Sequence, residues 1–434
     1  MAKKASRAKK QVEEESGVEF VTDVPSWFRR ERGRILNKGN LPESGECVVY
    51  WMIRDVRSVD NWALLYARHL AAKYNQPLMV LYVLPPPPST TETVDEDVPP
   101  LQTSQKMTLR HGDFLLGGLQ CVHKELNSLN IPMHVLQPDN VEVAQMVQDF
   151  ITNQKASTCV VDYSPLRHVV GWLEQLTSVK IPVIQVDAHN IVPVWHASSK
   201  REVGARTLRP KLHKLLPDFL TDFPTLSPNT NKSSTPNINW GECHSFLQMD
   251  TSVPSINEIC PPGNEAAMNQ FTSFLSKGLS KFDELRNDPN YRHVCSNMSP
   301  YINHGQVSFQ RLAWEVKHLK KHPLGTAAFL EEGIVRRELS DNYVHYTPND
   351  YDTLQGAAQW AQDSLELHST DEREYLYTTR QLQRGETHDD LWNASQHQLV
   401  QEGTLHGFVR THQIQKNTFW NIFYRILLQH FFLM

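Results

Sequence analysis

Short apolar runs alternate with amphipathic segments between Cys47 and Asp187, and this alternation constrains the fold more than any other feature of the sequence. The apolar runs have the length and composition of buried strands, and they occupy residues 47–53, 78–84, 132–137, 158–163 and 181–187. The segments between them space their apolar residues as helices do, over 60–74, 115–129, 141–153 and 166–178. Strands that alternate with helices form right-handed crossovers, so we expect an α/β domain with a five-stranded, mainly parallel sheet covered on both faces.

A parallel sheet of this kind usually binds its ligand beyond the carboxyl ends of its strands. The sequence has no GxGxxG motif after its first strand and no Walker A motif, so the usual dinucleotide and nucleotide interpretations fail. The first half of the chain therefore predicts a fold without naming a ligand.

No apolar run of strand type follows Asp187, and we expect the second half of the chain to be helical. Helical patterns lie at 265–286, 306–321, 325–342, 354–368, 379–384 and 388–402. A stretch rich in Pro, Ser, Thr and Asn at 224–239 has the composition of a linker. We divide the chain into a disordered basic and acidic tail (1–25), an α/β domain (26–190), an interdomain linker (191–250), an all-α domain (251–410) and an apolar tail (411–434).

Charge and cysteine content exclude several classes of protein. Forty-three basic and forty-eight acidic residues give a net charge of −5, which does not suit a protein that coats nucleic acid through bulk charge but allows a local basic groove. The six cysteines form no CxxC pair, so we expect reduced thiols and no metal site. No apolar run before residue 418 approaches the ~18 residues of a membrane span. The basic start MAKKASRAKK lacks the apolar core of a secretory signal, and we expect a nuclear protein, with the cytoplasm and the mitochondrion as alternatives.

Polar residues ahead of a predicted helix make the stretch SNMSPYINHGQVS (296–308) a candidate phosphate site. Ser296, Asn297 and Ser299 supply hydroxyl and amide groups near the unpaired backbone N–H groups of a helix start. The simpler interpretation is that Ser299, just before Pro300, only caps the helix.

The stretch LEEGIVRRELSDNY (330–343) concentrates charge on a predicted helix. Glu332, Arg336 and Asp341 fall near one helical face, with Arg337 and Glu338 beside them. The alternative to a functional site is a set of solvated i,i+4 ion pairs.

Three further features have both a functional and a structural interpretation. Lys317, Lys320 and Lys321 share one face of the helix predicted at 306–321, and they suit either phosphate contacts or an ordinary solvated face. Trp392 lies in ETHDDLWNASQHQLV (386–400), and a Trp in a helical domain is more often core than cofactor contact. Arg410 ends the stretch LHGFVR and is not diagnostic alone.

These motifs, in this order, resemble those of the class II cyclobutane pyrimidine dimer photolyases of the photolyase/cryptochrome superfamily. The resemblance also includes VVYWMIRDVRSVDNWALLYA (48–67), QVDAHNIVPVW (185–195), ARTLRPKL (205–212) and RNDP (286–289), and it runs from Trp27 to Arg410. VDAHNIVPVW and the pattern THDxLWNAxQ are long and specific for that class. The resemblance implies an α/β antenna-type domain joined by a long linker to a helical domain, which agrees with the division above.

The resemblance further implies a carbon–carbon lyase that binds FAD in its helical domain. Such an enzyme flips a pyrimidine dimer out of UV-damaged duplex DNA and splits it by light-driven electron transfer. By motif position, Glu332 would hydrogen-bond the dimer and Trp392 would belong to the electron-transfer chain. The residues expected to bind FAD are Ser296, Asn297, Met298, Ser299 and Arg410. Those expected to contact DNA are Arg336, Arg337, Lys317, Lys320 and Lys321. We expect a monomer with no membrane partner. The sequence leaves open whether the protein has an antenna chromophore of the deazaflavin type or no antenna chromophore.

The sequence departs from that family at positions inside the helical domain. Asn303 and His304 replace His and Phe, and Phe282 falls near a position that often holds a flavin-contacting Tyr. Gly333 stands where Leu is usual, and Gly inside a helix costs about 0.5–1 kcal/mol relative to Ala.

The family pattern ends after Arg410. Gln413 stands where a flavin-proximal Trp is expected, and the apolar tail follows. We therefore expect a helical domain that is incomplete at its C-terminus and holds FAD weakly. The alternatives to an active photolyase are a catalytically impaired DNA-binding isoform and a cryptochrome-like photosensor.

Overall fold

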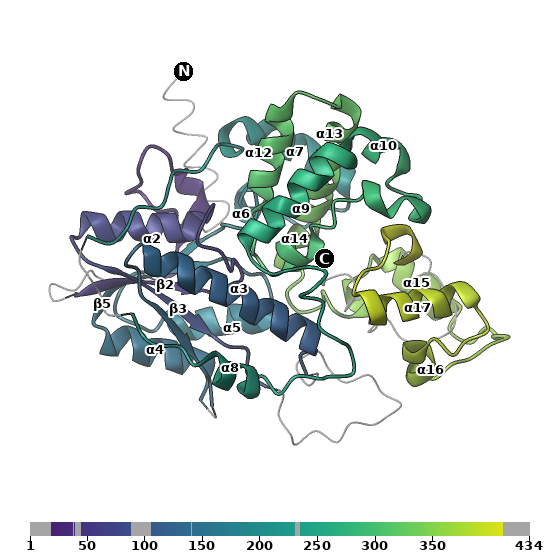
Figure 1. Ribbon diagram of the computed structural model, residues 1–434, viewed down its shortest axis with the longest axis horizontal. Coiled ribbons are helices and arrows are strands. Elements are labelled where there is room, and N and C mark those ends of the chain that lie inside the picture. Colours follow the sequence, from purple (N-terminus) through teal and green to yellow (C-terminus); the bar gives the residue numbers. More distant parts are fainter. Residues whose placement is uncertain are drawn as a thin grey trace.

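The computed structural model describes residues 19–37, 39, 45–87, 106–139, 141–230 and 235–410. Figure 1 shows a sheet with helices on its faces at the lower left of the molecule and a second group of helices above and to the right. The predicted disordered tail lies outside the described residues from 1 to 18, and the predicted apolar tail at 411–434, with Gln413, lies outside them entirely.

The sheet has six strands in the order β1-β6-β5-β2-β3-β4. They are β1 (Gly33–Ile35), β2 (Cys47–Met52), β3 (Leu78–Val83), β4 (Met133–Leu136), β5 (Ala156–Asp162) and β6 (Val183–Val186). Every neighbouring pair is parallel except β1 with β6. The predicted α/β fold is confirmed, but the predicted number of five strands is wrong. The sequence pattern misses β1 because this edge strand has only three residues, one of them Arg34.

Alternate residues of β2 pack into different cores on the two faces of the sheet. The even-numbered residues pack with α2 (Trp62–Lys73) and α3 (Leu109–Ser128). The odd-numbered residues pack with α4 (Val143–Asn153) and α5 (Arg167–Leu176). Every residue of β2 is buried, which explains why the strand is a continuous apolar run in the sequence.

After β6 the described residues form helices and turns without a further strand. These elements are α6 (Val194–Ala197), α7 (Ala205–Phe219), α8 (Trp240–Phe246), α9 (Asn264–Lys277), η2 (Leu279–Lys281), α10 (Phe282–Leu285), η3 (Pro289–Val294), α11 (Ser299–Asn303), α12 (Phe309–Leu319), α13 (Pro323–Leu330), η4 (Glu331–Arg336), α14 (Arg337–Tyr346), η5 (Leu354–Gly356), α15 (Gln359–Leu367), α16 (Thr379–Arg384) and α17 (Asp390–Glu402).

Residues 191–250 are more than the linker that their composition predicts. They contain α7, and its Leu208 and Leu212 are buried in the same core as Phe271 of α9 and Leu312 of α12. The segment thus supplies a helix to the second domain as well as the connection to it.

The single helix predicted at 325–342 is interrupted by the π-helical turn η4 between α13 and α14. Gly333 lies in this turn, and a Cβ atom there would stand 1.7 Å from the ring of Phe309 in α12. That ring is itself stacked on Phe329, with 5.4 Å between centroids, so it has little room to withdraw. Gly333 therefore allows α12 and η4 to approach each other, and π turns are frequent at functional sites.

Candidate functional site

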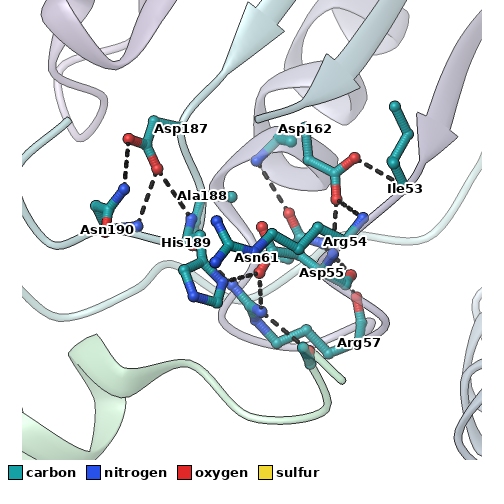
Figure 2. A network of polar contacts seen from close by, with 12 residues as sticks. Ile53, Arg54, Asp55, Arg57, Asn61, Asp162, Asp187, Ala188, His189 and Asn190 are labelled. Carbon is teal, nitrogen blue, oxygen red and sulfur yellow. Dashed lines mark hydrogen bonds and ion pairs between the residues drawn. The ribbon is translucent and has the colours of Figure 1, made fainter. Parts of the chain in front are cut away.

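Asp162 is the last residue of β5 and lies beside the carboxyl end of the neighbouring strand β2 (Figure 2). Its carboxylate accepts hydrogen bonds from the backbone N–H groups of Ile53, Arg54 and Asp55 at 2.7, 2.9 and 2.7 Å. The strand order reverses between β2 and β5, which is where doubly wound sheets usually hold a ligand. Here a side chain of the protein itself engages the backbone donors at that position.

Asp55, Arg57 and His189 form a buried polar cluster beside Asp162 (Figure 2). Asp55 Oδ1 lies 2.6 Å from Arg57 Nη1 and 3.2 Å from His189 Nδ1. Burial alone would raise the pKa of Asp55, but the charge of Arg57 and the hydrogen bond from His189 hold it well below its usual range. Burial, together with the charge of Asp55, raises the pKa of Asp162 to about 7. Burial and the nearby Arg54 lower the pKa of His189 to about 4, so this imidazole is neutral at neutral pH.

The same edge of the sheet contacts the helical domain. Both terminal nitrogens of Arg54 donate to Asp341 of α14, at 2.9 and 3.0 Å, and Asn190 Nδ2 donates to Asp341 at 2.8 Å. The backbone N–H of Ile191 donates to Glu338 of α14 at 2.7 Å. The alternative of solvated i,i+4 pairs is therefore wrong for Asp341 and Glu338, which face the α/β domain. This edge joins the two domains.

Glu332 lies in the π turn η4, and its side chain is 48% exposed. Its Oε1 lies 3.7 Å from Nη2 of Arg286, which directly follows α10. The Arg286 guanidinium also lies over the ring of Phe282, 5.8 Å from its centroid. The Glu332 carboxylate is thus open to solvent and has a cation beside it.

Ser296 and its neighbours connect η3 to α11 close to Arg286. Cys295 Sγ lies 4.0 Å from the carbonyl oxygen of Arg286, and Gln270 of α9 donates to the carbonyl of Ser296 at 3.1 Å. Asn297 has a φ of 55° and an exposed side chain. The side chain of Met298 is buried in the helical core, which leaves its backbone for the predicted ligand contact.

His406 brings the end of the described chain to the same place. Its Nε2 lies 2.9 Å from the carbonyl oxygen of Arg286. Arg410 is one helical turn further on, with its backbone N–H donating to His406 O at 3.0 Å, and burial lowers the pKa of its guanidinium. The segments that carry Glu332, Ser296 and Arg410 therefore meet around Arg286, although they are far apart in the sequence.

Trp392 lies apart from this group, in the small core between α16 and α17. It is 3% exposed, packs with Leu382 and Tyr377, and donates from Nε1 to the carbonyl of Leu382 at 3.1 Å. This environment favours the core interpretation, and the place of Trp392 in an electron-transfer chain stays a prediction.

The arginines and lysines expected to contact DNA differ in their surroundings. Arg336 is exposed, whereas Arg337 donates to Gly333 O, Asn190 Oδ1 and Glu338 Oε1 at 2.9, 3.4 and 3.3 Å. Arg337 therefore contacts residues of the domain interface, and its assignment to DNA stays a prediction. The predicted helical face with three lysines is also wrong, because α12 ends at Leu319. The exposed residues Lys320 and Lys321 lie in the turn that follows, and Lys317 is exposed on the helix itself.

Comparison with known proteins supplies the family. The DNA photolyase family profile matches residues 48–229. The deoxyribodipyrimidine photo-lyase of Potorous tridactylus is 40% identical over 402 residues, which cover 91% of this chain and 71% of that protein. This chain belongs to the deoxyribodipyrimidine photo-lyase family. The photo-lyase of Arabidopsis thaliana is also 40% identical, over 90% of this chain and 77% of its own length.

Solved structures of photolyases and cryptochromes share the fold. A class III photolyase from Agrobacterium tumefaciens superimposes with a TM-score of 0.64 at 17% identity, covering 90% of this chain and 80% of that one. A cryptochrome from Synechocystis gives 0.62 at 15% identity, covering 89% and 78%. The two-domain photo-lyase fold is thereby confirmed, and at these identities the fold does not separate repair enzymes from photosensors.

FAD is the cofactor that membership of the photo-lyase family implies, and the residues around Arg286 fit it. In the part of the chain that the structure describes, the side chains of Ser296, Asn297 and Ser299 donate no hydrogen bond within the protein. Hydroxyl, amide and guanidinium groups with free donors suit phosphate and ribityl oxygens. Arg286 and Arg410 supply the guanidinium groups.

Sequence reasoning missed three residues that connect the segments of this candidate site. Arg286 begins the RNDP motif that contributes to the resemblance, yet the motif gives it no role. Nothing in the sequence marks Gln270 or His406, because their contacts are to backbone carbonyls of distant segments.

None of the helices in the described part of the chain has the length and hydrophobicity of a membrane span.

Proposed function

We propose that this chain is a deoxyribodipyrimidine photo-lyase that uses bound FAD and light to split cyclobutane pyrimidine dimers in DNA. The observation that carries the proposal is the meeting of Glu332 with Arg286 and with the segments of Ser296 and Arg410. When bound, reduced FAD supplies the electron that cleaves the dimer.

Glu332 is the residue proposed to contact the dimer. Its carboxyl group is half-exposed, so a base flipped out of the duplex can reach it. In its protonated form the carboxyl donates a hydrogen bond to a base carbonyl, and this bond strengthens as negative charge develops there. Arg286 restricts the orientation of the group.

The donors around Arg286 are proposed to hold FAD. Ser296, Asn297 and Ser299 would bind the phosphates and the ribityl chain, together with the backbone of Met298. Arg410 would lie on the flavin side. The free donors of the three polar side chains support this assignment.

The proposed substrate is UV-damaged duplex DNA with the dimer flipped out. Arg336, Lys317, Lys320 and Lys321 are exposed and suit contacts to phosphates. We also propose a class II enzyme that acts as a monomer in the nucleus. A deazaflavin-type antenna chromophore in the α/β domain is the alternative to having no antenna chromophore.

The proposal is tested with the purified chain and a duplex that carries one thymine dimer. FAD content is measured by absorbance, and dimer loss is measured in blue light and in the dark. We expect the purified chain to hold FAD weakly and the dimer to disappear only in light. Glu332→Ala should lower the repair rate at least tenfold with FAD content unchanged. Glu331→Ala changes the neighbouring carboxylate and is the control, for which the repair yield per bound duplex is compared. A dimer that persists in light although FAD is bound would contradict the proposal and favour a photosensor.

A further inference from the structure

Arg337 closes the π turn η4, which carries Glu332. In an α-helix the backbone N–H of Arg337 would donate to the carbonyl of Gly333, four residues earlier. In η4 it donates to the carbonyl of Glu332, five residues earlier. The side chain of Arg337 donates to the carbonyl that this shift bypasses, because its Nε lies 2.9 Å from Gly333 O. Arg337 therefore binds the carbonyl groups of both Glu332 and the residue that follows it.

The guanidinium group of Arg337 is held in place by residues of both domains. Its Nη1 donates to Asn190 Oδ1 at 3.4 Å, in the segment that follows β6, and its Nη2 donates to Glu338 Oε1 at 3.3 Å. Its Cζ lies 5.4 Å from the centroid of the Phe309 ring in α12. The side chain of Arg337 is only 13% exposed, so the surrounding protein determines its position.

The ring of Phe309 packs against the same turn. It contacts Gly333, where a Cβ atom would stand 1.7 Å from it, and it is stacked on Phe329 of α13. Arg337 and Phe309 thus both contact the residue directly after Glu332. The Glu332 carboxylate lies 3.7 Å from Arg286, which is longer than a hydrogen bond, so this contact alone does not fix its orientation. The orientation of the Glu332 side chain therefore depends on the backbone of η4.

We propose that Arg337 is a positioning residue, which fixes the backbone of η4 so that the Glu332 carboxyl group points at the dimer. The proposal rests on the proposed function, because Arg337 acts on the dimer only through Glu332. Groups that act on a reacting centre must be held within about 0.5 Å of their productive position. A displacement of about 1 Å can slow a reaction on the order of 100-fold. Arg suits this role because its planar group donates in several fixed directions at once, which the ammonium group of Lys does not.

The test is Arg337→Lys, which keeps the positive charge and removes the planar group. The repair rate in blue light is measured with excess reduced FAD, at a protein concentration that binds all of a duplex with one thymine dimer. Saturation removes differences in binding from the comparison. We expect the rate to fall about fivefold or more, because Glu332 is displaced. FAD content and the affinity for the undamaged duplex should not change.

The same substitution in the Glu332→Ala background shows whether the effect passes through Glu332. Residues that act as a unit have non-additive effects on the rate. The double variant Glu332→Ala/Arg337→Lys should therefore repair the dimer no more slowly than Glu332→Ala alone. A general loss of structure would slow repair by the same factor in both backgrounds.

Arg167→Lys is the matched control. Arg167 of α5 also lies over an aromatic ring, with its Cζ 4.9 Å from the centroid of Tyr351. It also donates to a backbone carbonyl, that of Asn349 at 2.9 Å, and to the carboxylate of Asp352 at 2.8 Å. These partners follow the C-terminal end of α14, whereas Glu332 precedes its N-terminal end. Arg167→Lys should therefore leave the repair rate of the bound dimer unchanged.

The outcomes separate this proposal from the proposed function. If the wild-type chain repairs the dimer and folded Arg337→Lys repairs it equally fast, the positioning role is wrong and the function stands. A further decrease in the Glu332→Ala background, or weaker binding of the undamaged duplex, would overturn the proposal because Arg337 would act independently of Glu332. If thermal unfolding shows that Arg337→Lys is not folded, Phe309→Leu replaces it in both comparisons. If the wild-type chain repairs no dimer, the proposed function fails and this proposal fails with it.

Discussion

Among the buried carboxyl groups at the domain interface, Glu338 has an oxygen that nothing satisfies. Its Oε1 accepts from Ile191 and Arg337, whereas Oε2 is buried and has no hydrogen-bond partner among the described residues. Burial raises the pKa of Glu338 to about 8, and the charges of Asp187 and Asp341 act in the same direction. The group is therefore neutral at neutral pH inside a network of charges.

Ionisation of Glu338 should destabilise the wild-type protein at alkaline pH, and the Glu338→Gln variant should not show this destabilisation. The folded-state pKa is raised, so the stabilisation from protonation is complete below the ordinary pKa of about 4.5 and is lost as pH rises to about 8. Gln keeps the acceptor for Ile191 and does not ionise. Between pH 5 and pH 9 the free energy of unfolding should fall by on the order of 2–4 kcal/mol more in the wild type than in the variant. Urea denaturation at each pH measures this difference.

Asp341→Asn is the matched comparison at the same interface. Burial alone would raise the pKa of Asp341, but the charge of Arg54 and the hydrogen bonds that it donates hold this pKa well below its usual range, so the ionised form is the stabilising one. Asn should therefore cost stability at pH 7 and above, by about 3–5 kcal/mol, because Arg54 is left without its partner. Equal pH profiles for Glu338→Gln and the wild type would refute the role of Glu338.

At the scale of elements, the sequence predicts what local pattern determines and misses what distant side chains impose. The strands β2 to β6 can be predicted from their apolar runs alone, and β2, β5 and β6 are buried along their whole length. β1 depends on pairing with β6, and the π turn η4 depends on the ring of Phe309 in another helix. The same division holds for the site. Glu332 is identified by a motif, whereas its neighbour Arg286 is brought to it by folding.

Gly333→Ala should destabilise the protein, although Ala is the better helix former by up to ~1 kcal/mol. The added Cβ would stand 1.7 Å from the buried Phe309 ring, and overpacking of this kind costs about 1–3 kcal/mol. Combining it with Phe309→Leu should recover part of the loss, which a double-mutant cycle by urea denaturation measures. A stabilising Gly333→Ala, or additive effects in the cycle, would show that the ring does not require glycine.

At the scale of the whole molecule, the C-terminal end of α17 is hydrogen-bonded to the α/β domain. Arg110 of α3 donates to the carbonyls of Leu399 and Val400 at 2.9 and 2.6 Å. A cation is favourable at a helix C-terminus, where carbonyl groups are unpaired. Gly403, with φ of 70°, ends the helix, and a Cβ there would stand 2.9 Å from Arg110 Nε. The yellow helices α16 and α17 at the right of Figure 1 are thus connected to the sheet domain through α3.

Arg110→Gln should loosen this connection locally. Two charge-assisted hydrogen bonds are lost, so amide hydrogen exchange over residues 390–410 should quicken about tenfold or more, with exchange in the sheet unchanged. Arg292→Gln is the control, because its ion pair with Glu402 is half-exposed on both sides and should change exchange less than threefold. Equal exchange in Arg110→Gln and the wild type would show that α17 is held by other contacts.

The ion pair between Arg54 and Asp341 joins residues that the ribosome synthesises at very different times. The six strands of the sheet are complete in sequence once Val186 has been made, but Asp341 lies about 150 residues further on. At 5–20 residues per second the ribosome needs roughly 8–30 s to supply it. During that interval Arg54, the side-chain amide of Asn190 and the backbone N–H of Ile191 face water or a chaperone, since α14, whose carboxylates accept from them, does not yet exist. The donors at the carboxyl edge of the sheet therefore gain their acceptors only when α14 has been synthesised.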